Sequence, residues 1–301
     1  MIYEYAVSPN LFGNPANLNF LFESFKFGSG RIISDYPRKE WVKYVRACIK
    51  GSVQEESERN AWIELLILLH KNNLLFERQG PLWDEQINWV MNAINEHHRR
   101  PFRGILNDKK VINEPDVISV GPSIHSHSKW EVSSTRSIPR RAAELVQSVA
   151  DLINMSNKLI LIDRNFDPSE GYFSKVLVAF ADYLLKVRTH QPKIQQIKFV
   201  TTYEDYKTKE TKEQFENRCR KYLPELLPSG IQVKFHLKVK NLLHPRFVLT
   251  NIGGVLFDWG LDENDGKPTI ISRLSIDNFN LEWKQWDKNV IHEFTILGLK
   301  N

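Results

Sequence analysis

The sequence predicts two domains: an N-terminal α-helical domain over residues 1–115 and a C-terminal layered α/β domain over residues 137–301. Three observations support this. At 301 residues, the chain has the size at which a single hydrophobic core begins to divide. Apolar residues recur at helical spacing between residues 37 and 98, whereas after Ser137 helical patterns alternate with short apolar runs. Turn-forming residues break any regular period over 116–136, which we interpret as a linker.

Three helices account for the N-terminal prediction, and residues 1–30 read as irregular structure. Ser34-Asp35-Tyr36-Pro37 is a helix-start signal, and apolar residues follow at helical spacing up to residue 49. Residues 55–70 predict a second, largely buried helix with acids in its first turn. A third is expected over 83–98. Its basic end, His97-His98-Arg99-Arg100, suits either a solvated helix terminus or a phosphate contact.

The C-terminal domain alternates helices and strands. A helix is expected to open at residues 138–141, followed by a buried strand at 158–163 and a helix at 172–188. We then expect a strand at 197–201, a charged helix at 204–222 and a strand at 231–237. An edge strand at 270–274 and a closing element at 283–294 complete the α/β prediction.

Composition and charge restrict the class of protein. No apolar run reaches the ~18 residues of a membrane helix, and no secretory signal is recognisable. Cys48 and Cys219 lie far apart, so neither a disulfide framework nor a metal site is expected, and we expect a cytoplasmic protein without a cofactor. Residues 1–120 contain 15 basic and 15 acidic residues, so the net charge of +5 lies in residues 121–301. That excess favours an anionic partner such as nucleic acid, or simply aids solubility.

The most informative stretch is 242–262, which reads as a β-hairpin. In a strand, His244, Arg246 and Val248 would share one face. Gly253-Gly254 is expected to form the turn, and residues 255–257 the partner strand. A guanidinium beside an imidazole on a rigid hairpin is suited to holding a phosphate.

The spacing His244-x-Arg246-x4-Asn251 resembles the phospholipase D signature, His-x-Lys-x4-Asp, with two of the three polar positions changed. The longer segment from Leu243 to Gly254 is similar to the corresponding segment of single-copy phospholipase-D-like domains in bacterial anti-phage or mobile-element proteins. It is also similar to the non-catalytic C-terminal domain of some MIT-domain proteins. The resemblance covers roughly residues 133–301. It implies a phospholipase-D-like sandwich of sheet and helices, and a place in a protein complex for antiviral defence.

In active phospholipases D, two copies of the motif meet, one histidine attacking phosphorus and the other protonating the leaving group. This chain has one copy, so the resemblance implies that catalysis would need a homodimer pairing two His244 residues. Arg246 keeps the positive charge of the family's lysine. Asn251, however, cannot stabilise an imidazolium as a carboxylate does, unless Asp258 or Asp262 replaces it.

Three hypotheses follow. In the first, the domain binds DNA or RNA without catalysis, through Arg246 and Arg140 or Arg164, with a hydrogen bond from His244 and Asn251 beside them. In the second, it is a dimeric phosphodiesterase or nuclease that uses His244. In the third, it is a structural or protein-interaction domain in which His244 and Arg246 pair with Asp163 or Asp167.

Overall fold

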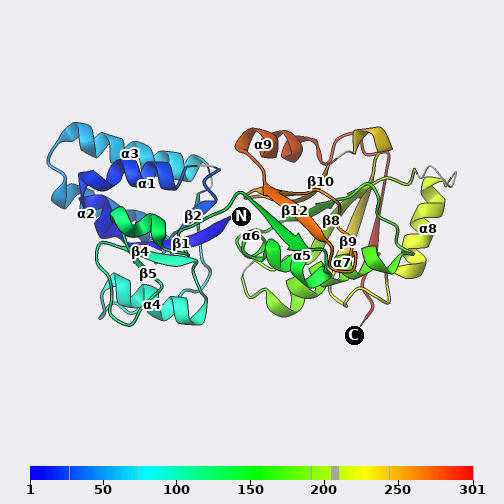
Figure 1. The fold of residues 1–301 in the computed structure, drawn as a ribbon, viewed down its shortest axis with the longest axis horizontal. Coiled ribbons are helices and arrows are strands. Elements are labelled where there is room, and N and C mark those ends of the chain that lie inside the picture. The colour runs from blue at the N-terminus through cyan, green and yellow to red at the C-terminus, as the bar shows by residue number, and fades with distance from the viewer. Residues whose placement is uncertain (27, 73, 191, 205–209, 244, 301) are drawn as a thin grey trace. The chain divides into compact units, whose positions relative to one another are not determined.

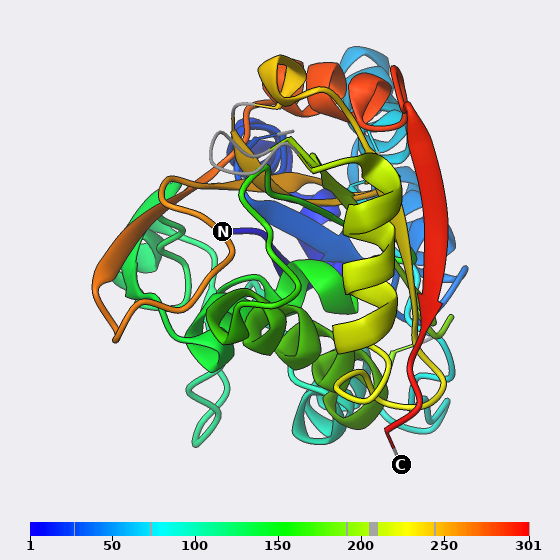
Figure 2. The same ribbon diagram turned by 90° about the vertical axis from the view of Figure 1, so that its right-hand side faces the viewer.

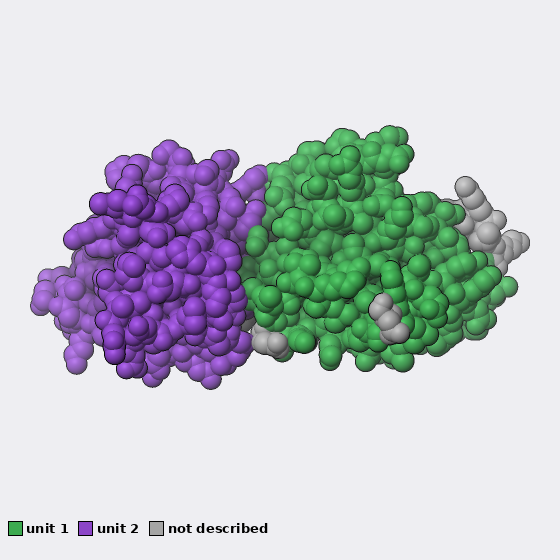
Figure 3. Space-filling view, turned by 90° about the horizontal axis from the view of Figure 1, so that it is seen from below, with its two compact units in different colours: residues 1, 134–301 green, residues 2–133 purple. Residues whose placement is uncertain are grey.

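A computed structural model of the chain describes all residues except 27, 73, 191, 205–209, 244 and 301. The chain divides into two compact units, coloured separately in Figure 3. We call residues 2–133 the N-terminal unit, and residue 1 with residues 134–301 the C-terminal unit.

The N-terminal unit contains a parallel sheet. Among the described residues this sheet has five strands in the order β3-β2-β1-β4-β5. They are β1 (Tyr3–Val7), β2 (Arg31–Ser34), β3 (Leu75–Phe76), β4 (Gly104–Asn107) and β5 (Val117–Ser119). The prediction of a purely helical domain is therefore wrong. These strands are only two to five residues long, too short to show a clear period in the sequence.

Helices surround this sheet at the three predicted places. They are α2 (Trp41–Ser52), α3 (Glu56–Lys71) and α4 (Trp89–Arg99). A short α1 (Leu18–Ser24) and the 3-10 turns η1 (Pro9–Gly13), η2 (Pro15–Asn17) and η3 (Pro122–Ser126) complete the unit. The segment read as a linker, 116–136, contains β5 and η3, and residues up to Ser133 belong to this unit.

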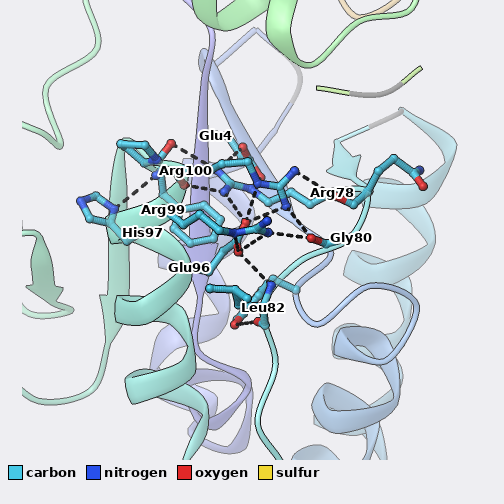
Figure 4. A network of polar contacts seen from close by, with 12 residues as sticks. Glu4, Arg78, Gly80, Leu82, Glu96, His97, Arg99 and Arg100 are labelled. Carbon is cyan, nitrogen blue, oxygen red and sulfur yellow. Dashed lines mark hydrogen bonds and ion pairs between the residues drawn. The ribbon is translucent and has the colours of Figure 1, made fainter. Parts of the chain in front are cut away.

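A buried ionic network ties β1 to α4 (Figure 4). Arg78 is fully buried and donates from Nε and Nη2 to the two carboxylate oxygens of Glu4, over 2.7 and 2.8 Å. Its Nη1 donates to Glu96 over 3.1 Å. Arg99 and Arg100 donate to the same Glu96 carboxylate. The basic end of α4 is thus occupied in holding the fold together rather than in contacting phosphate.

His97 has a structural role as well. Its Nδ1 accepts a hydrogen bond from the Phe102 amide, so Nε2 carries the proton and donates to Asp116 over 2.8 Å. Burial lowers the pKa of His97 more than the Asp116 carboxylate raises it.

The C-terminal unit is built on a mixed sheet. In the described residues it has eight strands in the order β13-β9-β8-β7-β10-β11-β12-β6. They are β6 (Thr135–Pro139), β7 (Leu159–Ile162), β8 (Gln196–Thr201), β9 (Gln232–Leu237), β10 (Arg246–Thr250), β11 (Gly254–Phe257), β12 (Pro268–Arg273) and β13 (His292–Leu297). Strands β7, β8 and β9 are parallel, and the other pairings are antiparallel.

Helices lie on both faces of this sheet (Figures 1 and 2). One face carries α5 (Ala142–Ser148), α6 (Ala150–Asn154), α7 (Gly171–Asp182) with the π-turn η4 (Tyr183–Val187), and α8 (Lys212–Tyr222). The other carries α9 (Ile276–Gln285) and η5 (Lys240–Leu242). The layered α/β architecture predicted for this region is confirmed. The segment 270–274 is not an edge strand, however, because β12 pairs with both β11 and β6.

Alternation along the strands determines which side chains enter the core. Phe199 of β8 and Phe235 of β9 are buried with ring centroids 5.5 Å apart. Phe166, just after β7, packs against both. Side chains one position away on the same strands, such as Lys198 and Lys234, therefore point to the opposite face, where α9 lies.

The hairpin at 246–257 forms, but its turn differs from the prediction. The Thr250 amide donates to the Gly253 carbonyl, so Asn251 and Ile252 form the turn rather than Gly253-Gly254. Gly254 instead lies in β11 opposite Leu249. A Cβ there would approach Leu249 and Leu274 side-chain carbons to 2.6 and 2.8 Å. Glycine at 254 allows the two leucines to pack closely here, and it does not serve the turn conformation.

Candidate phosphate-binding site

The hairpin brings Arg246 to the end of the sheet where β7 finishes. Phe247 pairs with Ile162 in antiparallel register, so Arg246 at the start of β10 lies beside Asp163, the residue after β7. Polar residues at the carboxyl ends of parallel strands are where α/β sheets usually place their sites. Of the sequence-predicted residues, the structure brings these two together.

Asp163 is fully buried and anchors two loops. Its Oδ2 accepts a hydrogen bond from the Leu261 amide over 2.7 Å, and its Oδ1 accepts one from the Asn165 amide over 2.9 Å. Burial raises the pKa of Asp163, against the opposing effects of these amides and of the Arg246 charge. The carboxyl group thus supports the site from beneath and is not exposed to a ligand.

Arg246 is half-buried, and its donors are underused. Nη1 makes one long contact, 3.5 Å, to the Asp258 carbonyl oxygen. Nε is buried and has no hydrogen-bond partner in the described part of the chain. A guanidinium has five N–H donors, and a buried one without an acceptor is unfavourable. An incoming oxyanion would supply the missing acceptor.

Gly260 allows the loop after β11 to approach Asp163. Its φ is +139°, and an added Cβ would lie 2.7 Å from Asp262 Oδ1 and 3.2 Å from Asp163 Oδ2. No larger residue fits this position without moving the acids. Trp259 precedes Gly260 in the chain. Its backbone amide donates a hydrogen bond to Thr269 Oγ1 over 3.4 Å, and the residue is 62% exposed.

Arg140 is not available to a ligand. It is buried, and its Nη2 forms an ion pair with the Asp262 carboxylate. The predicted phosphate contact of Arg140 stays a prediction, and the structure weighs against it because the Asp262 carboxylate neutralises the Arg140 charge. Asp262 is likewise committed to Arg140, and the exposed Asp258 meets Arg246 through its backbone carbonyl.

Asn251 lies away from Arg246. It follows β10 at the opposite end, where its Oδ1 accepts a hydrogen bond from the Asn157 amide over 2.9 Å. The five residues of β10 separate the two side chains by roughly 16 Å at ~3.3 Å per residue. Asn251 holds the hairpin turn and is not a ligand-binding partner of Arg246. His244 lies outside the described residues.

A polar cavity of about 360 Å³ opens at the ends of β7 and β8. Arg164 lines it, together with Asp167, Glu204, Glu210, Arg218 and Lys240. Arg218 bridges Asp167 and Glu210, with contacts of 2.6 and 2.7 Å. Burial would raise the pKa of Asp167, but hydrogen bonds from Arg218 and Ser169 outweigh it and lower the pKa.

Asp167 is thus paired with Arg218, so of the two acids named in the structural-pairing hypothesis, Asp163 is the one beside Arg246. Sequence reasoning missed Arg218 because it lies in a highly charged helix in which nothing distinguishes one arginine from another. It also missed Trp259, because the sequence shows only a tryptophan next to a glycine and its exposure is visible only in the structure. Within the described residues, no group of three or more His, Cys, Asp or Glu side chains could hold a metal ion.

Comparisons with known proteins add little to this geometry. No family model and no curated protein matches the chain. A solved phospholipase D family member, Nuc from Salmonella typhimurium, is similar over 52% of this chain and 93% of that one, at 8% identity and a TM-score of 0.32. TrmBL2, an archaeal chromatin protein described as showing a novel mode of DNA binding, is similar over 82% of this chain and 81% of that one, at 8% identity and a TM-score of 0.22. At these values neither similarity establishes the fold or the function of this chain.

Among the described residues, no helix combines sufficient length with sufficient hydropathy to cross a bilayer.

Proposed function

We propose that the C-terminal unit binds single-stranded DNA or RNA without cleaving it, and that Arg246 contacts a backbone phosphate. The observation that carries this proposal is the unpartnered Nε of Arg246 at the end of β7 and β10. Beneath it, Asp163 holds the surrounding loops through the amides of Leu261 and Asn165. The cation is therefore presented on a fixed support.

Trp259 favours a nucleic acid over a simple anion. It follows Asp258, whose carbonyl contacts Arg246, so an exposed aromatic residue lies one position along the chain from that contact. Proteins bind unpaired bases by stacking them on such rings, while cations hold the phosphates. A base-paired strand has no free base face to offer, so this arrangement favours a single strand.

The sequence resemblance alone suggests the setting. On that basis we propose that the chain works as one subunit of a bacterial defence or mobile-element complex. Residues 121–301 carry the whole excess of positive charge, which suits an anionic partner.

The test is fluorescence polarisation of a labelled single-stranded oligonucleotide with the full chain. Arg246→Ala should weaken binding by roughly 10- to 100-fold, the equivalent of one charge-assisted hydrogen bond of ~1.5–3 kcal/mol. It should also reduce the salt dependence of binding by about one phosphate contact. Arg220→Ala, which removes an exposed arginine paired with Glu216 on α8, is the matched control and should change little.

The structural hypothesis keeps one supporting observation, the proximity of Arg246 to the buried Asp163. It predicts that Arg246→Ala lowers the melting temperature and leaves nucleic-acid binding unchanged, which would overturn our proposal. Metal-independent cleavage of the oligonucleotide, lost in His244→Ala, would instead support the dimeric nuclease.

A further inference from the structure

Basic side chains gather on the face of the eight-stranded sheet that carries α9. Lys198 of β8 and Lys234 of β9 are register partners, so they lie side by side on this face. His236 is two residues beyond Lys234 and shares the face. Trp286, directly after α9, contacts both neighbours: its ring lies 5.4 Å from the His236 ring and 4.3 Å from Lys198 Nζ.

His236 is buried without a hydrogen bond. It is 6% exposed, and within the described residues neither Nδ1 nor Nε2 has a hydrogen-bond partner. Its nearest acid is Glu293, whose Oε2 lies 3.9 Å from Nε2, too far for a hydrogen bond. The same Glu293 oxygen lies 3.1 Å from Lys234 Nζ, so Nε2 faces the side of the sheet on which that ammonium lies. A buried imidazole of this kind requires an explanation, such as an absent ligand.

Positive charge is concentrated beside His236. Burial lowers the pKa of Lys198, and the nearby charges of Lys158 and Lys234 lower it further. In the described part of the chain, Lys198 has no carboxylate within ion-pair distance, while Lys234 has Glu293. Asp287 and Glu293 offset these effects only in part, and crowded cations of this kind are typical of anion-binding sites.

We propose that Lys198, Lys234 and His236 form a binding site for a phosphate group, separate from the site at Arg246. The phosphate oxygens would accept hydrogen bonds from both ammonium groups and from His236 Nε2, and would displace Glu293 from Lys234. Strands β8 and β7 lie between β9 and β10, so His236 and Arg246 are roughly 14 Å apart at ~4.8 Å per strand. This inference does not depend on the function proposed for Arg246.

The test is a titration of the full chain with inorganic phosphate, with ionic strength held constant by chloride. The probe is the NMR signal of the His236 ring, identified by its disappearance in His236→Gln. We expect a saturable shift, and an affinity that rises as the pH falls and His236 becomes protonated. The other charged groups facing His236 are Lys198, Lys234, Glu293 and Asp287. Of these, Glu293 and Asp287 oppose an anion.

Two variants of opposite sign make the test decisive. Lys198→Met keeps the aliphatic stem on Trp286 and should weaken phosphate binding about tenfold, the equivalent of one charge-assisted hydrogen bond. Glu293→Gln removes the competing carboxylate and should strengthen it. Lys186→Met, which removes an exposed lysine paired with Asp182, is the matched control. The proposal is overturned if phosphate gives no saturable shift, if Lys198→Met behaves like the control, or if Glu293→Gln weakens binding.

A second arm identifies the source of the phosphate. In the Arg246→Ala background, an oligonucleotide that shifts the His236 signal at lower concentration than inorganic phosphate would assign the site to a nucleic-acid backbone. A shift with inorganic phosphate alone would assign it to a small phosphate compound. Both results support the site, and neither depends on whether Arg246 binds nucleic acid.

Discussion

Replacing Arg78 with methionine should lower the free energy of unfolding of the N-terminal unit more than any single surface substitution does. Arg78 is 0% exposed and is the ion-pair partner of Glu4 among the described residues. Glu96 would keep Arg99 and Arg100, but Glu4, only 7% exposed, would be left as a buried carboxylate without a cation. Breaking one side of a buried ion pair costs ~3–5 kcal/mol. We expect a loss of that size in the free energy of unfolding.

Urea unfolding followed by tryptophan fluorescence would measure this loss, because Trp41 and Trp62 are fully buried in the same unit. Arg38→Ala is the matched control. It breaks a largely exposed pair with Glu77 at 3.4 Å, which should contribute at most ~1 kcal/mol. Adding Glu4→Gln to Arg78→Met should recover part of the loss, since the unpaired charge is then gone. The reasoning is refuted if Arg78→Met costs no more than Arg38→Ala, or if the double variant shows no recovery.

Three further results are expected. Gly260→Ala should destabilise the C-terminal unit by ~1–3 kcal/mol in thermal or urea unfolding, because φ is +139° and the new Cβ would approach Asp262 to 2.7 Å; an unchanged melting temperature would contradict this. Thr211→Ala should remove the capping box that begins α8 and cost ~0.5–2 kcal/mol, whereas Thr211→Ser should cost much less. Acid should destabilise both units: against the effect of burial, the pKa of Glu96 is lowered from 4.5 by the Leu82 amide and then by Arg99 and Arg100, and the pKa of Asp167 is lowered from 3.8 by Arg218 and Ser169. The stability that these groups contribute is complete above their unfolded pKa values and is lost as the pH falls through the folded ones, so flat stability from pH 5 to pH 2 would exclude this linkage.

Long periodic or apolar segments were predictable from the sequence. The run at 158–163 is β7, because a strand buried on both faces needs continuous apolar residues, and 231–237, in which apolar and polar residues alternate, is β9. The helices at 41–52 and 56–71 follow from their spacing. The parallel sheet of the N-terminal unit was not predictable, because β2, β4 and β5 are three or four residues long and give no period. Their identity depends on pairing: β2 and β4 pair with β1, and β5 pairs with β4.

Of the candidate site, only the position of Arg246 in a hairpin was predictable from the sequence. The hairpin pattern predicted a strand that begins near Arg246, and the structure puts this residue beside Asp163, the acid that follows β7. The motif spacing suggested that Asn251 belongs with it, yet β10 carries the two residues to opposite ends of a strand. Equal spacing in sequence does not distinguish neighbours in a site from the two ends of an extended segment.

The sequence by itself determined the layered α/β character of residues 137–301 and the presence of many basic side chains in this region, since both depend on local pattern and composition. Only the tertiary structure decided which cations are available to a ligand. Arg140 forms an ion pair with Asp262, 122 residues away, and Arg218 with Asp167, 51 residues away, whereas in the described part of the chain Arg246 has no carboxylate within ion-pair distance and His236 has no hydrogen-bond partner. Ion pairs act over a few ångströms, and the chain brings such partners together only when it folds.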